Sequence, residues 1–177
     1  MLFVLSFSRI IKKKHILMKR DDLEVFMAMN RASDVARYMI ECAEEDGQPL
    51  SNLKLQKTLY FLWKRYFKEN NDYLFMDQYF SAWKFGPVIP SVYYDYFMFG
   101  AYPIARGLLE SFEEDSICDE DKKFIRKNLA DFKEKSVSEL TDETHKAGGA
   151  WERTFRYKGM KEIIPFTEIE DDVKNGR

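Results

Sequence analysis

The sequence predicts a predominantly α-helical protein that forms a single compact domain, with at most a small strand pair near residues 78–84. Apolar residues recur at helical spacing in several stretches, and helix start or stop signals bound most of them. The chain has 177 residues, of which 16% are aromatic, and this is enough to fill one hydrophobic core. We find no internal repeat and no low-complexity tract that would indicate another architecture.

The first predicted helix has a narrow apolar face made of Val35, Ala36, Met39, Ile40 and Ala43. Gly47 is a stop signal that precedes Pro49. Ser51 is a good N-cap for the helix that follows. We therefore expect two antiparallel helices joined by a short connection.

Residues 52–69 carry the steepest helical pattern. One arc is apolar and contains Leu53, Leu55, Leu59, Tyr60, Leu62, Trp63, Tyr66 and Phe67. The opposite arc is basic and contains Lys54, Lys57, Lys64, Arg65 and Lys68, so we expect it to face solvent.

Two residues interrupt this division of the helix. Gln56 falls in the apolar arc, so we expect its amide to be buried and bonded to main chain or to the turn at residues 83–87, with a recognition role as the alternative. Phe61 lies among the lysines. It either packs under another part of the chain or forms an exposed anchor, in which case Lys57, Phe61, Lys64 and Lys68 would make a partner-binding surface.

An aromatic turn follows this helix. Residues 78–85 read as a short extended segment, and Pro87 restricts Gly86 to extended backbone. Pro90 suits the first turn of another helix, whose apolar positions lead to a stop at Gly100. We expect Trp83 and the neighbouring tyrosines to lie in the core.

Two further helices are expected in the second half of the chain. Residues 119–121 are acidic, which favours a helix N-terminus, and Phe124, Ile125, Leu129 and Phe132 continue at helical spacing. A shorter helix follows near residues 137–141, with Ser136 or Ser138 as its N-cap.

The N-terminal segment differs from the rest of the chain. Its apolar part is too short to cross a bilayer, and its lysines follow that part, whereas a signal peptide places positive charge first. If translation starts at Met18, Met27 or Met29, the residues before that methionine are an extension that the natural protein lacks. Alternatively, residues 1–29 form an ordered extra helix or a disordered basic arm. We expect residues 1–20 to be dispensable for stability.

Charge and cysteine content limit the possible partners. Six of the 28 basic residues precede the first acid, so the remainder carries 22 basic against 30 acidic residues, a net charge of −8. Such a domain does not favour a nucleic-acid backbone, although the lysine-rich helix could supply a local patch. Cys42 and Cys118 lack metal-ligand spacing, and we expect reduced thiols in the cytoplasm.

His145 is the residue most open to a catalytic interpretation, with Asp142 and Glu143 close in sequence. We find no second histidine in a suitable position, no nucleophile motif and no glycine-rich phosphate loop. We therefore expect His145 to cap a helix or to pack near Trp151. The sequence predicts no enzyme, no metal site and no cofactor.

Three motifs resemble a known family. They are the run from Leu53 to Tyr60, the run from Ala82 to Tyr93, and the later run from Leu140 to His145 followed by Trp151. Their order and spacing are similar to those of the Panacea domain, the SocA-like antitoxin and phage-associated domain of bacteria. The resemblance places the domain at residues 30–170, before a C-terminal tail at 171–177. The motif positions that it marks as structural are Leu55, Gln56, Tyr60, Trp83, Lys84, Gly86, Pro87, Pro90, Tyr93, His145 and Trp151.

The resemblance implies a helical module that neutralises a toxin protein encoded beside it, by direct contact and without enzymatic residues. A phage or mobile-element regulator that contacts nucleic acid is one alternative. A cryptic hydrolase that uses His145 is another. The sequence implies no membrane partner and leaves the oligomeric state open.

Overall fold

The computed structural model describes residues 30–105 and 117–176. The predicted N-terminal extension, residues 1–29, lies outside these ranges. The helices are α3 (Ala32–Glu45), α4 (Asn52–Asn70), α5 (Pro90–Asp95), α6 (Asp119–Lys133), α7 (Val137–Thr144), α8 (Ala150–Tyr157) and α9 (Phe166–Lys174), and a short 3-10 helix η1 (Phe97–Phe99) follows α5. The prediction of a mostly helical fold is confirmed.

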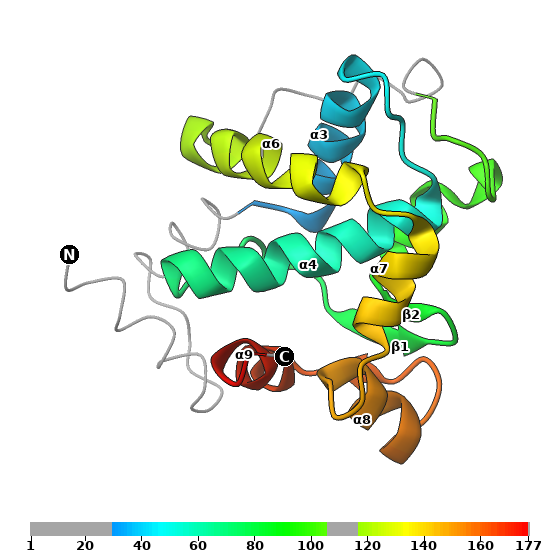
Figure 1. The fold of residues 1–177 in the computed structure, drawn as a ribbon, viewed down its shortest axis with the longest axis vertical. Coiled ribbons are helices and arrows are strands. Elements are labelled where there is room, and N and C mark those ends of the chain that lie inside the picture. The colour runs from blue at the N-terminus through cyan, green and yellow to red at the C-terminus, as the bar shows by residue number, and fades with distance from the viewer. Residues whose placement is uncertain (1–29, 106–116, 177) are drawn as a thin grey trace.

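Helix α4 lies at the centre of the fold (Figure 1). Helices α3 and α6 pack on one side of it, while α9 packs on the other side. The N-terminal half of α4 is covered by α7 and by a small sheet. An amphipathic helix on a protein surface packs against the core with one face only. Helix α4 has neighbours on several sides and therefore packs with more than one face.

The ends of the helices follow the signals in the sequence. Ser51 caps α4 by accepting a bond from the main-chain N–H of Lys54 at 3.4 Å. Ser136, rather than Ser138, caps α7 and forms a reciprocal capping box with Glu139. Pro90 is the first residue of α5, and Gly47 takes a φ of +68° just after α3. These predicted boundaries are therefore confirmed.

The sheet has three strands, whereas the sequence predicts at most a strand pair. Strand β1 (Phe80–Trp83) pairs antiparallel with β2 (Gly86–Val88) and with β3 (Ile163–Ile164), so the strand order is β2-β1-β3. Strand β3 has only two residues and an exposed Ile163, and so short a segment gives no periodic signal. The sheet brings residues near 160 beside the hairpin of β1 and β2 (Figure 1).

The core is rich in stacked aromatic rings. Trp63 of α4 stacks on Phe166 of α9 with 4.7 Å between ring centroids, and its indole N–H donates to the carbonyl of Phe75. Near the other end of α9, buried Asp172 accepts a bond from the main-chain N–H of Ala150 and pairs with Arg153 at 3.0 Å. Residues 171–174, which the family resemblance places in the C-terminal tail, belong to α9, and this helix supports the N-terminus of α8.

Candidate partner-binding site

The hairpin of β1 and β2 is held against α4 by two consecutive side chains. Gln56 is fully buried, and its amide oxygen accepts from the main-chain N–H of Ile89 at 2.9 Å. Its amide nitrogen donates to Asn52 at 3.3 Å. The prediction that Gln56 is buried and bonded to main chain is confirmed, and its partner lies just beyond the predicted turn.

Lys57 provides the second attachment. Its side chain is fully buried, and the ammonium donates to the carbonyl of Pro87 at 3.2 Å. Burial lowers the pKa of Lys57 from 10.5 to about 7, because the low-dielectric surroundings disfavour the charged form. The expectation that Lys57 faces solvent is therefore wrong, and its predicted role in binding a partner loses the exposure on which it rested. Strand β2 and α7 cover the side of α4 on which it lies.

Gly86 is required by the same close packing. A Cβ atom at this position would lie 2.7 Å from Lys57 Nζ and 2.7 Å from Thr144 Oγ1. Its φ of +106° also belongs to a region that residues with side chains rarely adopt. Gly86 is the first residue of β2, so its backbone is extended as predicted, but with a positive φ that favours glycine. The absence of a side chain at this position lets β2 approach the buried lysine.

His145 lies at the C-terminal end of α7 and stacks on Trp151, with ring centroids 3.8 Å apart and an interplanar angle of 6°. Its Nε2 atom is buried and has no hydrogen-bond partner among the described residues. Burial and the nearby ammonium of Lys57 lower the pKa of His145. The predicted packing against Trp151 is confirmed. It orients Trp151, whose indole N–H donates to the carbonyl of Trp83 at 2.9 Å.

The remaining positions of the predicted lysine surface separate into different environments. Phe61 stacks on Phe132 of α6 with 5.7 Å between centroids, so it packs under another part of the chain and is not an exposed anchor. Lys64 is half-buried, and burial lowers its pKa. Lys68 is exposed near the C-terminal end of α4. A partner-binding role for Lys64 or Lys68 stays a prediction. Such a surface would lack Phe61, the aromatic anchor that the alternative interpretation placed at its centre.

The motif positions gather around the hairpin, except for two that belong to the core. Leu55 and Tyr60 are buried on α4, and the Tyr60 ring meets Phe80 of β1 edge to face at 5.2 Å. The others contact or form the hairpin and the helix after it: Gln56, Trp83, Lys84, Gly86, Pro87, Pro90, Tyr93, His145 and Trp151. Three distant parts of the sequence thus support one structural feature.

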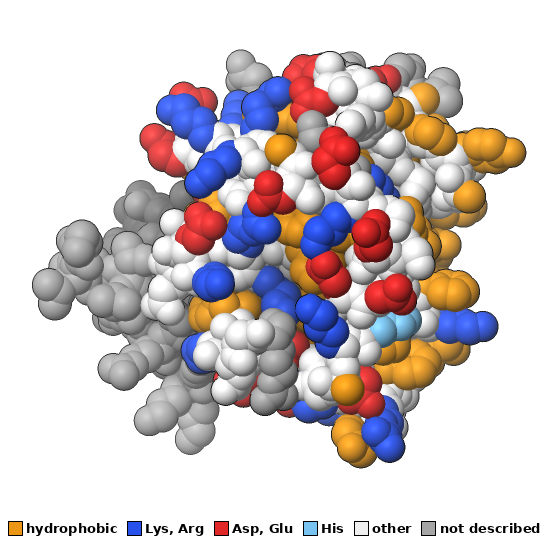
Figure 2. All heavy atoms as spheres, viewed as in Figure 1, with side chains coloured by type: hydrophobic (Ala, Val, Ile, Leu, Met, Phe, Trp, Pro, Cys, Tyr) orange, Lys and Arg blue, Asp and Glu red, His pale blue; other side chains and the backbone are white. Residues whose placement is uncertain are grey.

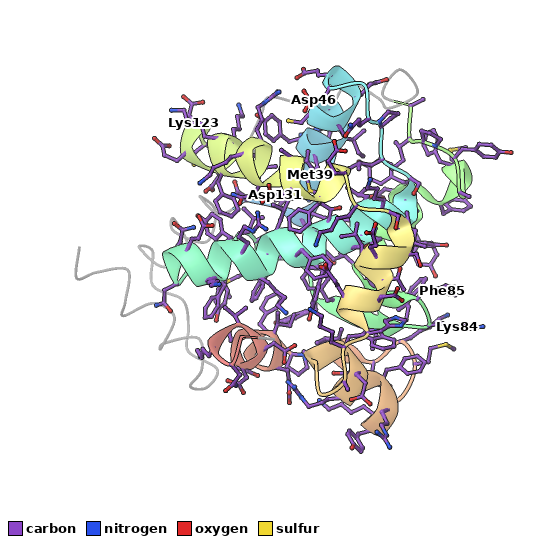
Figure 3. All side chains as sticks on the ribbon, in the orientation of Figure 1. Met39, Asp46, Lys84, Phe85, Lys123 and Asp131 are labelled. Atoms are coloured by element: carbon purple, nitrogen blue, oxygen red, sulfur yellow. The ribbon has the colours of Figure 1, made fainter. Side chains whose placement is uncertain are left out.

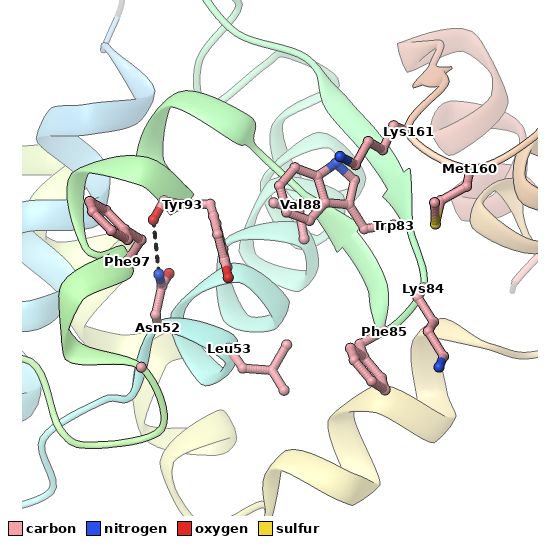
Figure 4. Close-up of a pocket in the computed structure, with 11 residues that line it drawn as sticks. Asn52, Leu53, Trp83, Lys84, Phe85, Val88, Tyr93, Phe97, Met160 and Lys161 are labelled. Carbon is pink, nitrogen blue, oxygen red and sulfur yellow. Dashed lines mark hydrogen bonds between the residues drawn. The ribbon is translucent and has the colours of Figure 1, made fainter.

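A groove of about 330 Å³ opens beside this hairpin (Figure 4). Its lining comes from α4, the hairpin, the α5–η1 segment and the turn before β3, and includes Leu53, Trp83, Phe85, Val88, Tyr93, Phe97 and Met160. We call this lining the aromatic groove. The indole N–H of Trp83 is buried there without an acceptor among the described residues. Lys84 and Lys161 also line the groove, and Figure 4 shows Lys161 beside the Trp83 ring.

Exposed apolar side chains gather at and beside the edge of the aromatic groove. Phe85, Tyr94, Phe97 and Met160 are each between 56% and 62% exposed. Phe85 and Lys84 project from the tip of the hairpin (Figure 3), and apolar atoms continue along this edge of the molecule in the space-filling view (Figure 2). Clustered exposed aromatic residues are typical of surfaces that bind a partner.

The sequence reasoning missed this surface because it assigned the aromatic residues to the core. Val92 and Tyr96 are indeed buried, but Trp83 and Tyr93 are only partly buried and Tyr94 is exposed. Helix α5 ends at Asp95, so Phe97 leaves the helical phase that would have turned it inward. The excess of aromatic residues between 93 and 102 was the available signal.

The structure is a helical domain with an exposed apolar groove. Among the described residues there is no cluster of three potential metal ligands, and no helix combines the length and apolarity that crossing a bilayer requires. The model of the family "Antitoxin SocA-like, Panacea domain" matches residues 55–152, more than half of the chain. The chain belongs to this family.

A curated relative is similar over part of the chain. It is Antitoxin SocA of Caulobacter vibrioides (strain NA1000 / CB15N), 44% identical over 62 residues, which are 35% of this chain and 32% of the relative. The match thus spans about a third of that protein's length. No solved structure matches this chain. Neither comparison supports the association with phages or mobile elements that the resemblance implied.

Proposed function

We propose that this protein is an antitoxin that neutralises a toxin protein, encoded beside it, by direct contact through the aromatic groove. The observation that carries the proposal is the exposed groove in a member of the SocA-like antitoxin family. The relative's name says that it is an antitoxin. A toxin would be the partner of such a protein.

Affinity at such an interface depends on a few well-placed anchors rather than on contact area as such. Phe85 and Phe97 stand on opposite sides of the groove, one on the hairpin and the other on η1. Both are attached to rigid elements, because the hairpin is bonded to α4 and α5 follows directly from it. A preformed surface loses little conformational entropy on binding, which favours occlusion of the toxin's active surface.

Growth rescue tests this proposal. The toxin encoded beside this gene should stop growth when expressed alone, and co-expression of this chain should restore it. A Phe85→Ala/Phe97→Ala variant should lose rescue, because alanine at a central aromatic anchor costs about 2 kcal/mol or more. Tyr157→Ala is the matched control, since Tyr157 is an exposed aromatic residue on α8 that does not line the groove. Full rescue by the double variant in a folded protein would refute this contact surface.

A further inference from the structure

We propose that the toxin segment which enters the aromatic groove carries an apolar side chain flanked by carboxylates. This inference rests on the proposed function and adds the chemistry of the partner. The groove interior is apolar, whereas the two charged side chains in its lining are both lysines.

Lys84 and Lys161 stand at different edges of the groove. Lys84 is at the tip of the hairpin, with its ammonium 5.4 Å from the centre of the Phe85 ring. Lys161 follows Met160 in the turn before β3, with its ammonium 5.3 Å from the centre of the Trp83 ring. Both residues are exposed, and within the described residues neither one forms an ion pair with a carboxylate.

What distinguishes these two lysines is their place. Some other basic residues of the fold are paired, such as Arg153 with Glu168 and Asp172, and Arg65 with Asp131. The chain after residue 20 carries a net charge of −8, whereas both charged side chains in the groove lining are basic. Their positive potential favours an approaching acidic segment over a basic one.

The position of the aromatic residues adds a second requirement. The Lys84 ammonium lies over the Phe85 ring, and the Lys161 ammonium lies over the Trp83 ring. A carboxylate that pairs with either lysine therefore lies next to an aromatic ring that it cannot cover. An apolar side chain between two acidic residues fits both conditions, because it covers the rings while its neighbours reach the lysines. The indole N–H of Trp83 is buried behind this wall without an acceptor in the described part of the chain, so its NMR signal reports on the groove.

Two capped peptides test the chemistry directly. One has phenylalanine and leucine between pairs of aspartate and glutamate, and the other has lysine at every acidic position. In NMR titrations of the full chain, the acidic peptide should shift the Trp83 indole N–H and the amides around Phe85 and Phe97. The lysine peptide should shift them at least about tenfold less at equal concentration, since charge complementarity decides between the two. Equal shifts, or none with either peptide, would overturn the inference.

The toxin supplies an independent measurement. Lys84→Glu/Lys161→Glu should slow association about tenfold at an ionic strength of about 0.02 M, and the difference from the wild type should shrink at about 0.5 M salt. Lys127→Glu is the matched control, because Lys127 is an exposed lysine on α6 that does not line the groove. Lys68→Glu separately tests the predicted lysine surface on α4. If the Lys84/Lys161 variant binds like the wild type while Phe85→Ala/Phe97→Ala does not, the acidic partner is wrong and the proposed function stands. A toxin that does not bind the wild type at all would refute the proposed function. If this chain forms a dimer and Phe85→Ala dissociates it, the groove binds a second copy of the chain and the inference is overturned.

Discussion

Replacing Lys57 with methionine should remove a pH dependence of stability that a buried ammonium creates. The side chain is fully buried, and its hydrogen bond to Pro87 replaces only part of the lost hydration. Its pKa falls from 10.5 to about 7 in the folded protein. Between these values the unfolded chain holds a proton that the folded protein has released, so the free energy of unfolding rises with pH. This gain in the free energy of unfolding begins near pH 7 and is complete above pH 10.5, the pKa of the lysine in the unfolded chain.

The size of the effect follows from the two pKa values. Each pH unit inside the window contributes up to about 1.4 kcal/mol. Half of the folded molecules are protonated near pH 7, so the wild type should gain about 2 kcal/mol between pH 7 and pH 9 from Lys57 alone. Methionine has a similar length and does not titrate, so Lys57→Met should lack this contribution. At pH 7 the variant loses one hydrogen bond, which costs about 1 to 3 kcal/mol, but it avoids a larger desolvation cost.

Urea unfolding at pH 7 and pH 9 measures the difference. The pKa of His145 responds to Lys57, but burial alone already holds it below its usual value of 6.5, so His145 contributes little between pH 7 and pH 9 in either protein. The remaining titrating groups contribute equally, so the quantity to compare is the change with pH in the wild type minus that in Lys57→Met. Lys68→Met is the matched control, because Lys68 is exposed on the same helix and should behave like the wild type. The same pH dependence in the wild type and in Lys57→Met would refute the assignment of an uncompensated buried lysine.

Three further substitutions test the packing of the hairpin and the role of the histidine. Gly86→Ala should cost about 3 kcal/mol in urea unfolding, because the new Cβ would lie 2.7 Å from the ammonium of the buried lysine. Gly47→Ala, with a φ of +68° and open space, should cost only about 1 kcal/mol, and equal losses would contradict the close-packing argument. Gln56→Leu should lower the free energy of unfolding by about 1 to 3 kcal/mol, because it leaves the buried N–H of Ile89 unpaired. It should also shift the indole N–H signal of Trp83 in NMR spectra, whereas unchanged stability would count against attachment of the hairpin through Gln56. His145→Asn should retain growth rescue, since no proton transfer is required, and a folded variant without rescue would favour the hydrolase alternative.

Local sequence signals were sufficient for α3, α4, α6 and α7, whereas α8 and α9 were not predicted and α5 ends at Asp95 rather than at the expected Gly100. Ser51, Gly47 and Pro90 act on backbone groups a few residues away, so their effect is visible without knowledge of the tertiary structure. The burial of Gln56 was also predictable, because its place on the helix follows from a period of 3.6 residues.

The same period gave the wrong environment for Lys57, because α4 is covered on more than one side. Its neighbours on that side, β2 and α7, come from residues 86–88 and 137–144, and nothing near Lys57 in the sequence indicates them. The aromatic groove was missed for a similar reason. Leu53, Phe97 and Met160 lie on segments that only the tertiary fold brings together.

Titration calorimetry of the purified protein with the purified toxin encoded beside it tests the central claim most directly. We predict a stable complex of the wild type and the Tyr157→Ala control. The Phe85→Ala/Phe97→Ala variant should bind at least about thirtyfold more weakly, which corresponds to about 2 kcal/mol for loss of the groove's aromatic anchors. Equal affinity for the wild type and the double variant, with both proteins folded, would contradict recognition through the aromatic groove.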